Sequence, residues 1–388
     1  MPPSLAKRIE GLRNESAFEV LSRARALEVQ GRRILHLEIG QPDFPTPEHI
    51  VEAAFRAVRE GKTGYGPTLG VPELREAVAQ YTYQTRGVSV SADRVAITPG
   101  AKPMLFFTVL ALVEPGDEVI YPDPGFPIYA SVIRMAGGKP VPLPLREALG
   151  FRFEVAELAE RVSPRTKLVI LNSPQNPTGG VLGHQELEAI AELAERHDFY
   201  VLSDEVYSRL VYDTTAPSIA QLPGMLARTV LVDGVSKAYS MTGWRLGWGV
   251  LPEELVPAIE LLMVNSNSCT ATFIQYAAVA ALQGPQDCVA AMRAEFHRRR
   301  DRFVDGLNRI PGIRCEKPQG AFYAFPNTAQ LDPDDRRLAG RLLEEAGIAA
   351  LWGSSFGRYG TGYLRFSYAT AMEVLEESLE RLTAFVGG

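Results

Sequence analysis

Apolar and polar residues alternate in blocks along the middle of this chain. Short runs rich in Val, Ile and Leu, typical of buried β-strands, are interleaved with longer segments of helical periodicity. The strand-like runs are 95–98, 118–121, 167–171, 199–203, 229–233 and 246–250, and the helix-like segments are 102–113, 127–136, 185–197 and 253–263. Continuous apolar strands separated by helices predict an α/β fold, in which a mainly parallel sheet is covered by helices on both faces.

The two ends of the chain follow a different pattern. Before the sheet, the sequence predicts a helix over 17–30, an extended proline-rich crossing to residue 47, a helix over 47–60 and an exposed turn at 64–67. After a long helix over 290–307, it predicts strands at 313–316, 321–325, 348–351 and 363–368 and helices over 334–346 and 373–385. We therefore expect a large three-layer αβα domain over 48–288. A smaller α+β domain is expected from 289–388 together with the N-terminal arm 1–47.

Composition and charge exclude several classes of protein. The chain has 388 residues, 46% of them hydrophobic, which is enough for large cores. Its net charge of −6 and its dispersed basic residues argue against a nucleic-acid partner. The longest apolar run, 104–113, is about half the ~20 residues that a membrane span needs, and no apolar signal core follows the first charges. Three scattered cysteines predict neither disulfides nor a metal site, and they fit a reducing cytoplasm.

The stretch 229–250 carries the most informative polar residues. After an apolar run it breaks at Gly234, presents Ser236 and Lys237 on a predicted loop, and continues through Arg245 into the next apolar run. A lysine amine, whose usual pKa is about 10.4, is a poor nucleophile at neutral pH unless it is desolvated, lies near another cation or is held as a Schiff base. Taken alone, the stretch fits an ordinary loop lysine equally well.

Other predicted strands also lead into residues suited to a ligand. Gly100 precedes a helix whose first amide groups, at Ala101 and Lys102, are suited to bind an anion, phosphate above all. Asn176 follows the strand at 167–171 and offers a side-chain amide, while Phe126 places an aromatic ring at the sheet's edge. Ordinary turns and a core phenylalanine are the alternatives for these segments when each is considered alone.

Two charged residues also lie at or near strands. Asp204 and then Tyr207 follow the apolar run at 199–203, and a buried carboxylate there needs a partner, either a protonated ring nitrogen or an arginine or lysine. Arg365 alternates with apolar neighbours on a predicted strand, and its planar fork suits a carboxylate. A surface arginine is the alternative.

Together these residues supply a complementary set of chemical groups. The set contains an amine nucleophile, an acid for a ring nitrogen, phenol and amide donors for a ring oxygen, an anion-binding helix start and a guanidinium for a carboxylate. Pyridoxal phosphate and an amino acid substrate require these groups. The sequence therefore predicts a pyridoxal phosphate site beyond the carboxyl ends of the strands.

The chain resembles the fold-type I aminotransferases, the class that includes aspartate aminotransferases, over nearly all of its length. The motifs that carry the resemblance occur in the family's order: Gly40-Gln-Pro-Asp-Phe, Tyr65-Gly-Pro, Gly100-Ala-Lys, Asn176-Pro-Thr-Gly, Ser203-Asp-Glu-Val-Tyr207, Ser236-Lys237, Thr242-Gly-Trp-Arg245-Leu-Gly and Leu364-Arg365. The resemblance implies the type I fold of pyridoxal-phosphate-dependent transferases and a homodimer with shared active sites.

The resemblance also implies roles for residues around the cofactor ring. Lys237 bonds to the cofactor and, once freed, shuttles the proton between the substrate Cα and the cofactor. Asp204 keeps the pyridine nitrogen protonated, and Phe126 stacks on the ring. Tyr207 and Asn176 hold the ring oxygen.

Further roles concern the phosphate group of the cofactor. The resemblance implies that Ser236, Arg245 and the amides of Ala101 and Lys102 hold the phosphate. Tyr65 joins them from the partner subunit.

The substrate is expected to bind through its α-carboxylate. The resemblance implies that Arg365 grips this group, with Gly40 and Asn176 nearby. The expected activity is transfer of an amino group between an L-amino acid and a 2-oxoacid by ping-pong half-reactions. A carbon–sulfur β-lyase uses the same residues and is the alternative reaction. Trp352 stands where many relatives have proline, so the resemblance leaves the preferred substrate open.

Overall fold

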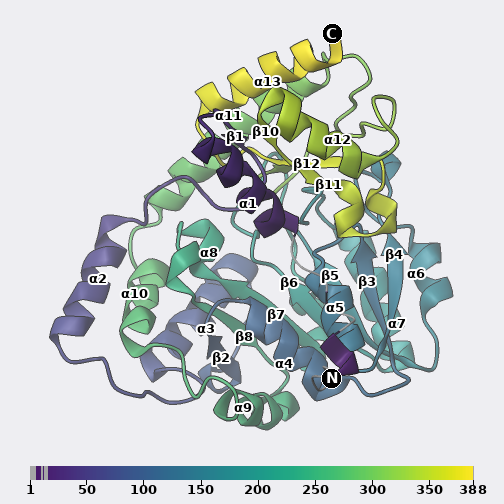
Figure 1. The fold of residues 1–388 in the computed structure, drawn as a ribbon. Coiled ribbons are helices and arrows are strands. Elements are labelled where there is room, and N and C mark those ends of the chain that lie inside the picture. Colours follow the sequence, from purple (N-terminus) through teal and green to yellow (C-terminus); the bar gives the residue numbers. More distant parts are fainter. Residues whose placement is uncertain (1–5, 10–11, 13–15, 388) are drawn as a thin grey trace, which may run out of the picture.

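A seven-stranded sheet forms the centre of the larger, lower part of the molecule in the computed structural model, which describes residues 6–9, 12 and 16–387 (Figure 1). Its spatial order is β2-β8-β7-β6-β5-β3-β4. The strands are β2 (Val95–Thr98), β3 (Glu118–Asp123), β4 (Lys139–Pro144), β5 (Thr166–Asn172), β6 (Tyr200–Asp204), β7 (Thr229–Gly234) and β8 (Gly247–Val250). Neighbours pair in parallel except at β8, which is antiparallel to both β2 and β7. The predicted mainly parallel sheet is confirmed.

Strand β4 was not predicted, because its sequence alternates with prolines at 140, 142 and 144. Proline has no backbone N–H group and is confined to the edges of sheets. Strand β4 pairs only with β3 and lies at the edge of the sheet. No strand lies on its outer side, so an N–H group that is missing there removes no hydrogen bond between strands.

Helices cover both faces of this sheet, as the apolar runs predicted. Leu168 and Ile170 of β5 belong to one core with α4 (Lys102–Leu112), α5 (Ile128–Met135) and α9 (Val256–Val264). Val169 and Leu171, which point to the opposite face, belong to a core with α7 (His184–His197). Helices α3 (Pro72–Arg86), α6 (Val155–Arg161) and α10 (Thr272–Gln283) were not predicted, and neither was the four-residue helix α8 (Val235–Ala238). Of these, α3 and α10 pack with β2, β7 and β8.

The upper part of the molecule joins the first and last segments of the chain (Figure 1). Strand β1 (Leu35–His36) pairs in parallel with β10 (Ile348–Ala349), beside helix α1 (Ser16–Val29). A three-stranded antiparallel sheet follows the order β11 (Leu351–Trp352), β12 (Leu364–Ser367), β9 (Tyr323–Ala324). Helices α11 (Asp287–Leu307), α12 (Asp335–Arg341) and α13 (Met372–Gly387) complete this part. The domain boundaries at 47/48 and 288/289 stay a prediction.

Three predictions in this upper part need correction. Segment 313–316 is not a strand, because only an isolated bridge joins Arg314 to Asn327. The predicted strand 348–351 divides between two sheets, since β10 pairs with β1 and β11 pairs with β12. The predicted helix 334–346 changes at Arg341 into a π-helical turn, Leu342–Ala346, which ends at Gly347.

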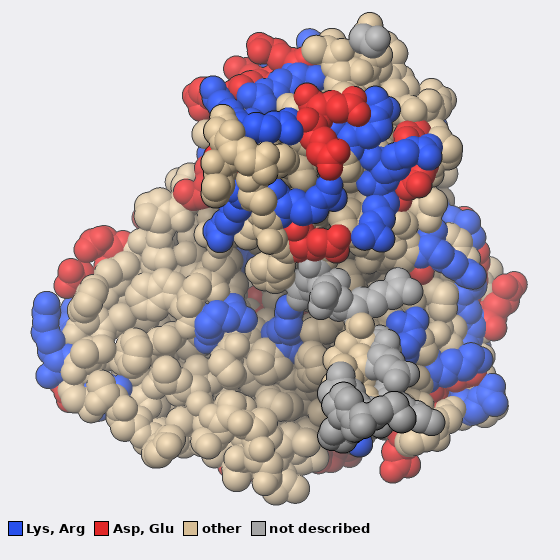
Figure 2. Space-filling view, in the orientation of Figure 1, with Lys and Arg blue, Asp and Glu red and all other residues tan. Residues whose placement is uncertain are grey.

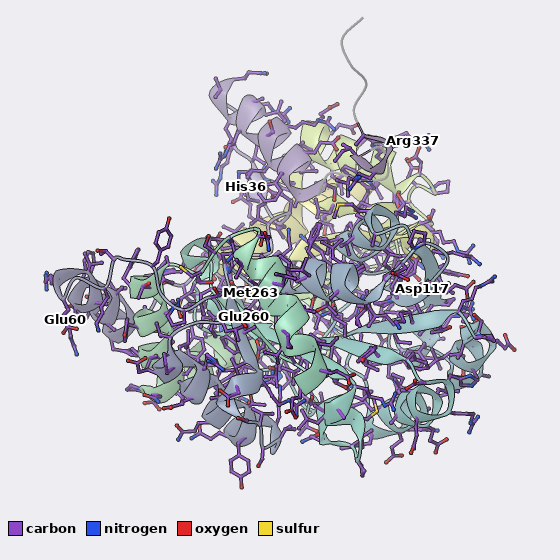
Figure 3. The ribbon with its side chains drawn as sticks, turned by 90° about the horizontal axis from the view of Figure 1, so that it is seen from below. His36, Glu60, Asp117, Glu260, Met263 and Arg337 are labelled. Carbon is purple, nitrogen blue, oxygen red and sulfur yellow. The ribbon has the colours of Figure 1, made fainter. Side chains whose placement is uncertain are left out.

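Helix α2 (Glu48–Arg59) extends to one side of the sheet. Viewed from below, Glu60 after α2 and Asp117 before β3 lie at opposite sides of the molecule, with Glu260 and Met263 of α9 between them (Figure 3). Among the described residues, no helix is long and apolar enough to cross a membrane.

Candidate functional site

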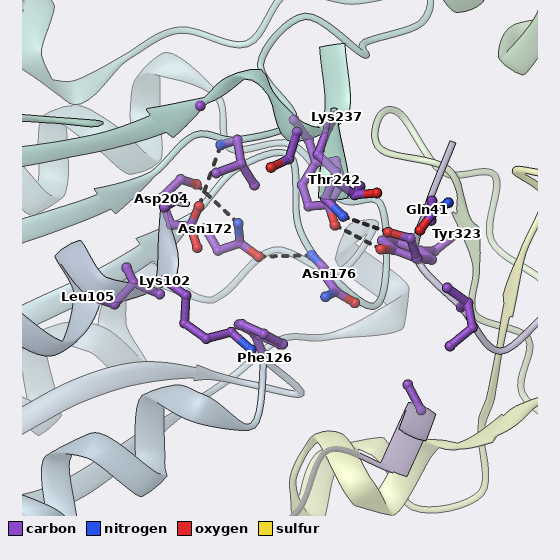
Figure 4. A pocket seen from close by; sticks show the side chains of 18 of the residues that line it. Gln41, Lys102, Leu105, Phe126, Asn172, Asn176, Asp204, Lys237, Thr242 and Tyr323 are labelled. Carbon is purple, nitrogen blue, oxygen red and sulfur yellow. Dashed lines mark hydrogen bonds between the residues drawn. The ribbon is translucent and has the colours of Figure 1, made fainter. Parts of the chain in front are cut away.

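A cavity of about 530 Å³ lies beyond the carboxyl ends of β5, β6 and β7. It is lined both by the loops of the large sheet and by residues of the upper part of the molecule (Figure 4). Most of the residues proposed from the sequence line this cavity: Gly40, Ala101, Lys102, Phe126, Asn176, Asp204, Tyr207, Ser236, Lys237, Arg245 and Arg365. Segments that are distant in the sequence therefore meet at one site.

Lys237 lies in a short helix rather than on the predicted loop. Strand β7 ends at Gly234, and α8 (Val235–Ala238) begins at the next residue. The Lys237 Nζ atom donates a hydrogen bond of 2.6 Å to the carbonyl oxygen of Gly40 in the N-terminal arm (Figure 4). The helix thus directs the amine across the cavity towards the crossing segment.

The surroundings of Lys237 make its amine easier to deprotonate. Desolvation by burial, followed by the positive charges of Arg365, Arg245 and Lys102, lowers the pKa of Lys237 to about 8. Burial disfavours the charged form, and neighbouring cations act in the same direction. The amine is therefore neutral in a much larger fraction of molecules near neutral pH than an ordinary lysine is, as a nucleophile or a proton acceptor requires.

Asp204 ends β6, and its carboxylate is buried beneath the cavity. Burial raises the pKa of Asp204 to about 6, although a hydrogen bond from Tyr129 acts in the opposite direction. The Tyr129 hydroxyl on α5 donates to Asp204 Oδ2 over 2.7 Å. Tyr129 was missed in the sequence, where it reads as an apolar position of a helix. The only sequence signal for Tyr129 was its spacing, because a residue three positions after Phe126 in a helix faces the same side as Phe126.

Two further lining residues were also missed. Asn172, the last residue of β5, accepts a hydrogen bond from the Asn176 backbone N–H through its Oδ1 atom (2.9 Å) and donates to the Asp204 carbonyl oxygen (3.1 Å). Tyr323 of β9 places its hydroxyl 2.8 Å from the hydroxyl of Tyr207. Asn172 stands at a strand end, like Asp204, and this placement could have revealed it. Tyr323 carried no comparable pattern.

Arg365 lies on β12 with its guanidinium buried at the upper side of the cavity. Its Nη1 atom donates to Asn176 Oδ1 over 3.2 Å, and Nη2 donates to the carbonyl oxygen of Glu38. The guanidinium lies 4.4 Å from the centroid of the Tyr323 ring. The planar fork is therefore held in one orientation, which suits bidentate binding of a carboxylate.

The part of the cavity at the start of α4 is suited to an anion, and we call it the anion-binding end. The Arg245 guanidinium lies against Gly100, just before the first amides of α4, and Ser236 is also a lining residue. Gly100 is not among the lining residues, but it makes room for this cluster. A Cβ atom at Gly100 would lie 2.3 Å from Arg245 Nη2, and the backbone φ of +88° also favours glycine.

Three further aromatic residues lie outside this cavity. Tyr65, expected to act across a subunit boundary, is 94% exposed in the turn after α2. Trp352, which stands where many relatives have proline, is not among the lining residues, and neither is Phe356. Phe356 instead packs behind Arg365, with 5.2 Å between the guanidinium and the ring centroid.

Comparisons with known proteins agree on one family. Residues 32–382 match the profile of aminotransferase class I and II. The chain is 39% identical to an aspartate aminotransferase of Geobacillus stearothermophilus, with 98% of each chain covered. It is 40% identical to aromatic-amino-acid aminotransferase 2 of Thermococcus litoralis, covering 98% of this chain and 97% of that protein.

A solved structure shares the whole fold. The aspartate aminotransferase from Thermus thermophilus with maleate superposes with a TM-score of 0.94 at 38% identity, covering 98% of this chain and 99% of that one. Members of this family depend on pyridoxal phosphate, and the cavity has the amine, carboxylate and anion-binding groups that this cofactor needs. The chain therefore belongs to the class I and II aminotransferases and is a pyridoxal-phosphate-dependent aminotransferase.

Proposed function

We propose that the cavity holds pyridoxal phosphate between the start of α4 and the end of β6. Ser236, Arg245 and the first amides of α4 would bind the phosphate. Asp204 would bind the pyridine nitrogen, and Phe126 would cover the ring. The chemistry of the donor groups supports this arrangement, because the lining residues include cationic and amide donors for a phosphate and the buried carboxylate of Asp204 for a ring nitrogen.

Bound pyridoxal phosphate supplies an electron sink for negative charge at the substrate Cα. In the proposed mechanism, the neutral Lys237 amine accepts the proton from this carbon and returns it on the cofactor side. The Asp204 carboxylate holds a proton on the pyridine nitrogen, because a cation opposite a buried carboxylate favours its ionised form. Tyr207 and Asn176 would donate hydrogen bonds to the ring oxygen. Two such half-reactions in sequence give ping-pong transfer between an L-amino acid and a 2-oxoacid.

We propose that the preferred substrates carry two carboxylates. Arg365 is suited to the α-carboxylate, and the side chain of Lys102 adds a second cation to the cavity, 5.2 Å from the centroid of the Phe126 ring (Figure 4). This lysine is the observation that carries the proposal. The names of the relatives support it, since one is an aspartate aminotransferase and the Thermus protein was solved with maleate, a dicarboxylate.

Donor preference in the Lys102→Met variant tests this substrate class. With 2-oxoglutarate as acceptor, we expect the wild type to use aspartate better than alanine or phenylalanine. The variant should lose about 10-fold or more in kcat/KM for aspartate, since one lost charge-assisted contact is equivalent to about 1.5–3 kcal/mol. It should retain activity with alanine, because the backbone amide of Lys102 is unchanged.

Lys139→Met is the matched control, because Lys139 is an exposed lysine that pairs with Glu118 far from the cavity. It should leave the donor preference unchanged. Equal losses for aspartate and alanine in Lys102→Met would contradict the dicarboxylate proposal. Release of ammonia and a 2-oxoacid from a cysteine-type donor without any acceptor would instead favour the β-lyase alternative.

We also propose a cytoplasmic homodimer. A broad area with few charged side chains covers α9 and α10 (Figure 2). Leu261 and Val264 on α9 are 65% and 51% exposed, and Phe55 on α2 is 55% exposed. Large exposed apolar areas are typical of protein interfaces. In such a dimer, the exposed Tyr65 would be available to the partner's cavity.

A further inference from the structure

A buried cluster of ions lies beside the cavity and takes no part in the mechanism described above. Arg86, the last residue of α3, has a side chain that is 3% exposed. Its Nε atom donates to Glu205 Oε2 over 2.6 Å, and its Nη2 atom donates to Asp233 Oδ2 over 2.6 Å. Both carboxylates are also buried, with side-chain exposures of 5% and 4%. One guanidinium therefore joins two carboxylates away from water.

The two carboxylates occupy the ends of the strands that carry the catalytic groups. Glu205 directly follows Asp204 at the end of β6, and Asp233 lies on β7 just before α8, which carries Lys237. The strands pair in parallel with Asp204 opposite Val232. Arg86 thus connects the ends of β6 and β7 through Glu205 and Asp233, and Glu205 is the residue directly after Asp204.

The remaining polar atoms of the cluster are also engaged, beginning with Arg86 Nη1, which donates to the Thr85 hydroxyl over 2.9 Å. Ser203 and Ser218 donate to Glu205 Oε1 over 2.9 and 2.6 Å, and the Gly234 backbone N–H donates to Asp233 Oδ1 over 2.7 Å. Arg86 Nη2 also donates to the Ser208 hydroxyl over 2.9 Å. All four oxygens of the Glu205 and Asp233 carboxylates therefore accept hydrogen bonds. This arrangement suits the ionised form of a carboxylate, which has acceptors but no donor.

The charges near Asp204 are unbalanced without Arg86. Asp204, Glu205 and Asp233 are three acidic groups at adjacent strand ends, and the charges of Asp233 and Glu205 both act to raise the pKa of Asp204. The other titratable groups that face the cluster are Tyr81 of α3, Arg209 after β6 and Tyr239 after α8, with Tyr129 of α5 at Asp204 itself. Removing a buried cation leaves its partner carboxylates uncompensated.

We propose that Arg86 is a positioning residue of this aminotransferase: it fixes the ends of β6 and β7 and balances the charge of Glu205 and Asp233 beneath the cofactor. This inference rests on the proposed roles of Asp204 and Lys237. Without Arg86, the field at the cavity becomes more negative. A more negative field favours the protonated form of every group in the cavity, so the pKa of each group should rise.

The pH midpoint of the absorbance change of the bound cofactor in the holoenzyme tests the charge balance. Arg86→Met should raise this midpoint by about one pH unit, the size expected for one charge at ~10 Å and an effective dielectric constant of ~20. Glu205→Gln should lower it. The double variant Arg86→Met/Glu205→Gln has the same net charge as the wild type and should return the midpoint to within about 0.3 unit of it.

Two conservative variants separate charge from folding. Arg86→Lys keeps the charge but loses the two-armed fork, so its midpoint should stay near that of the wild type while its thermal unfolding temperature falls. Arg300→Met removes another buried arginine, which lies on α11 and pairs with two carboxylates, Asp301 of the same helix and Asp213 of the segment after β6. It should lower stability and leave the midpoint unchanged. If Arg86→Met does not fold, Glu205→Gln and Arg86→Lys still decide the matter, because the first should lower the midpoint and the second should leave it unchanged.

An unchanged midpoint in Arg86→Met and Glu205→Gln would overturn the inference, as would a double variant that shifts further than Arg86→Met alone. Failure of the proposed function gives a different result. In that case the wild-type holoenzyme itself would fail to change its spectrum with an amino donor, whatever the state of residue 86.

Discussion

The amine of Lys237 receives its reactivity from its neighbours rather than from its own sequence context. Within the stretch 229–250 it cannot be told from an ordinary lysine, and it was expected on a loop. The fold places it in a short helix, half-buried, with Arg365 contributed by a segment more than a hundred residues away. The residue types and their spacing in the sequence indicated which side chains form the site. The electrostatic field that lowers the pKa of this amine arises only once the chain is folded.

A stability measurement on cofactor-free protein tests this field. Because folding lowers the pKa of Lys237 from 10.5 to about 8, its charged form is disfavoured in the folded state, and this cost is fully present below pH 8. The cost disappears as the pH rises through the unfolded value. We expect Lys237→Met to gain about 1–2 kcal/mol relative to the wild type at pH 7, after allowance for the partial exposure of the amine.

Denaturant unfolding of both proteins between pH 7 and pH 11 measures this difference. The gain of Lys237→Met should shrink steadily between pH 8 and pH 10.5. A difference that stays constant over this range would mean that the amine is not perturbed by folding.

The polar groups of the site stand at the ends of secondary-structure elements, and this placement explains what the sequence could predict. Asp204, Asn176 and the start of α4 were found because each follows an apolar run with a clear period. Strand β4 was missed because its prolines break that pattern. Segment 313–316 was wrongly predicted as a strand because a short alternation of apolar and charged residues does not specify a pairing partner. Tyr129 and Tyr323 were missed because the contacts that bring them to the cavity are tertiary.

Substitution of Gly100 tests the importance of the turn before α4. Gly100→Ala should weaken the binding of pyridoxal phosphate by about 10-fold or more, because the new Cβ atom would displace Arg245 from the anion-binding end. Gly116→Ala is a matched control, since its φ of +104° is equally strained but no atom lies within 4 Å of the added Cβ. Titration of cofactor-free protein with pyridoxal phosphate measures both affinities. Equal weakening in the two variants would assign the effect to backbone strain alone.

The cavity exists only where the two parts of the molecule meet. The N-terminal arm contributes Ala17, Phe18 and residues 39–41, and the last strands contribute Tyr323 and Arg365. The strand ends, helices and loops around the large sheet contribute the other lining residues. The sequence predicted both parts, but it could not predict how they are oriented, because that depends on pairings such as β1 with β10 over more than three hundred residues. If Tyr65 binds the phosphate in the partner subunit, as expected from the sequence, then the complete site also depends on how two chains are oriented.

Disruption of the uncharged face tests the proposed dimer. Leu261→Glu should shift the chain from dimer to monomer in sedimentation analysis, because it places a charge in an exposed apolar area on α9. Glu260→Gln, at the neighbouring position, is the control and should remain dimeric. If cofactor binding is completed across the interface, the monomeric variant should also lose affinity for pyridoxal phosphate. A wild-type chain that sediments as a monomer would contradict the proposal.

A half-reaction on the yellow holoenzyme tests the central claim most directly. On addition of an amino donor without any acceptor, the absorbance of the bound cofactor should convert to that of the pyridoxamine form, with release of one equivalent of the matching 2-oxoacid. The Lys237→Ala variant should not turn over. Spectral conversion without any oxoacid product, or full activity in Lys237→Ala, would contradict the account.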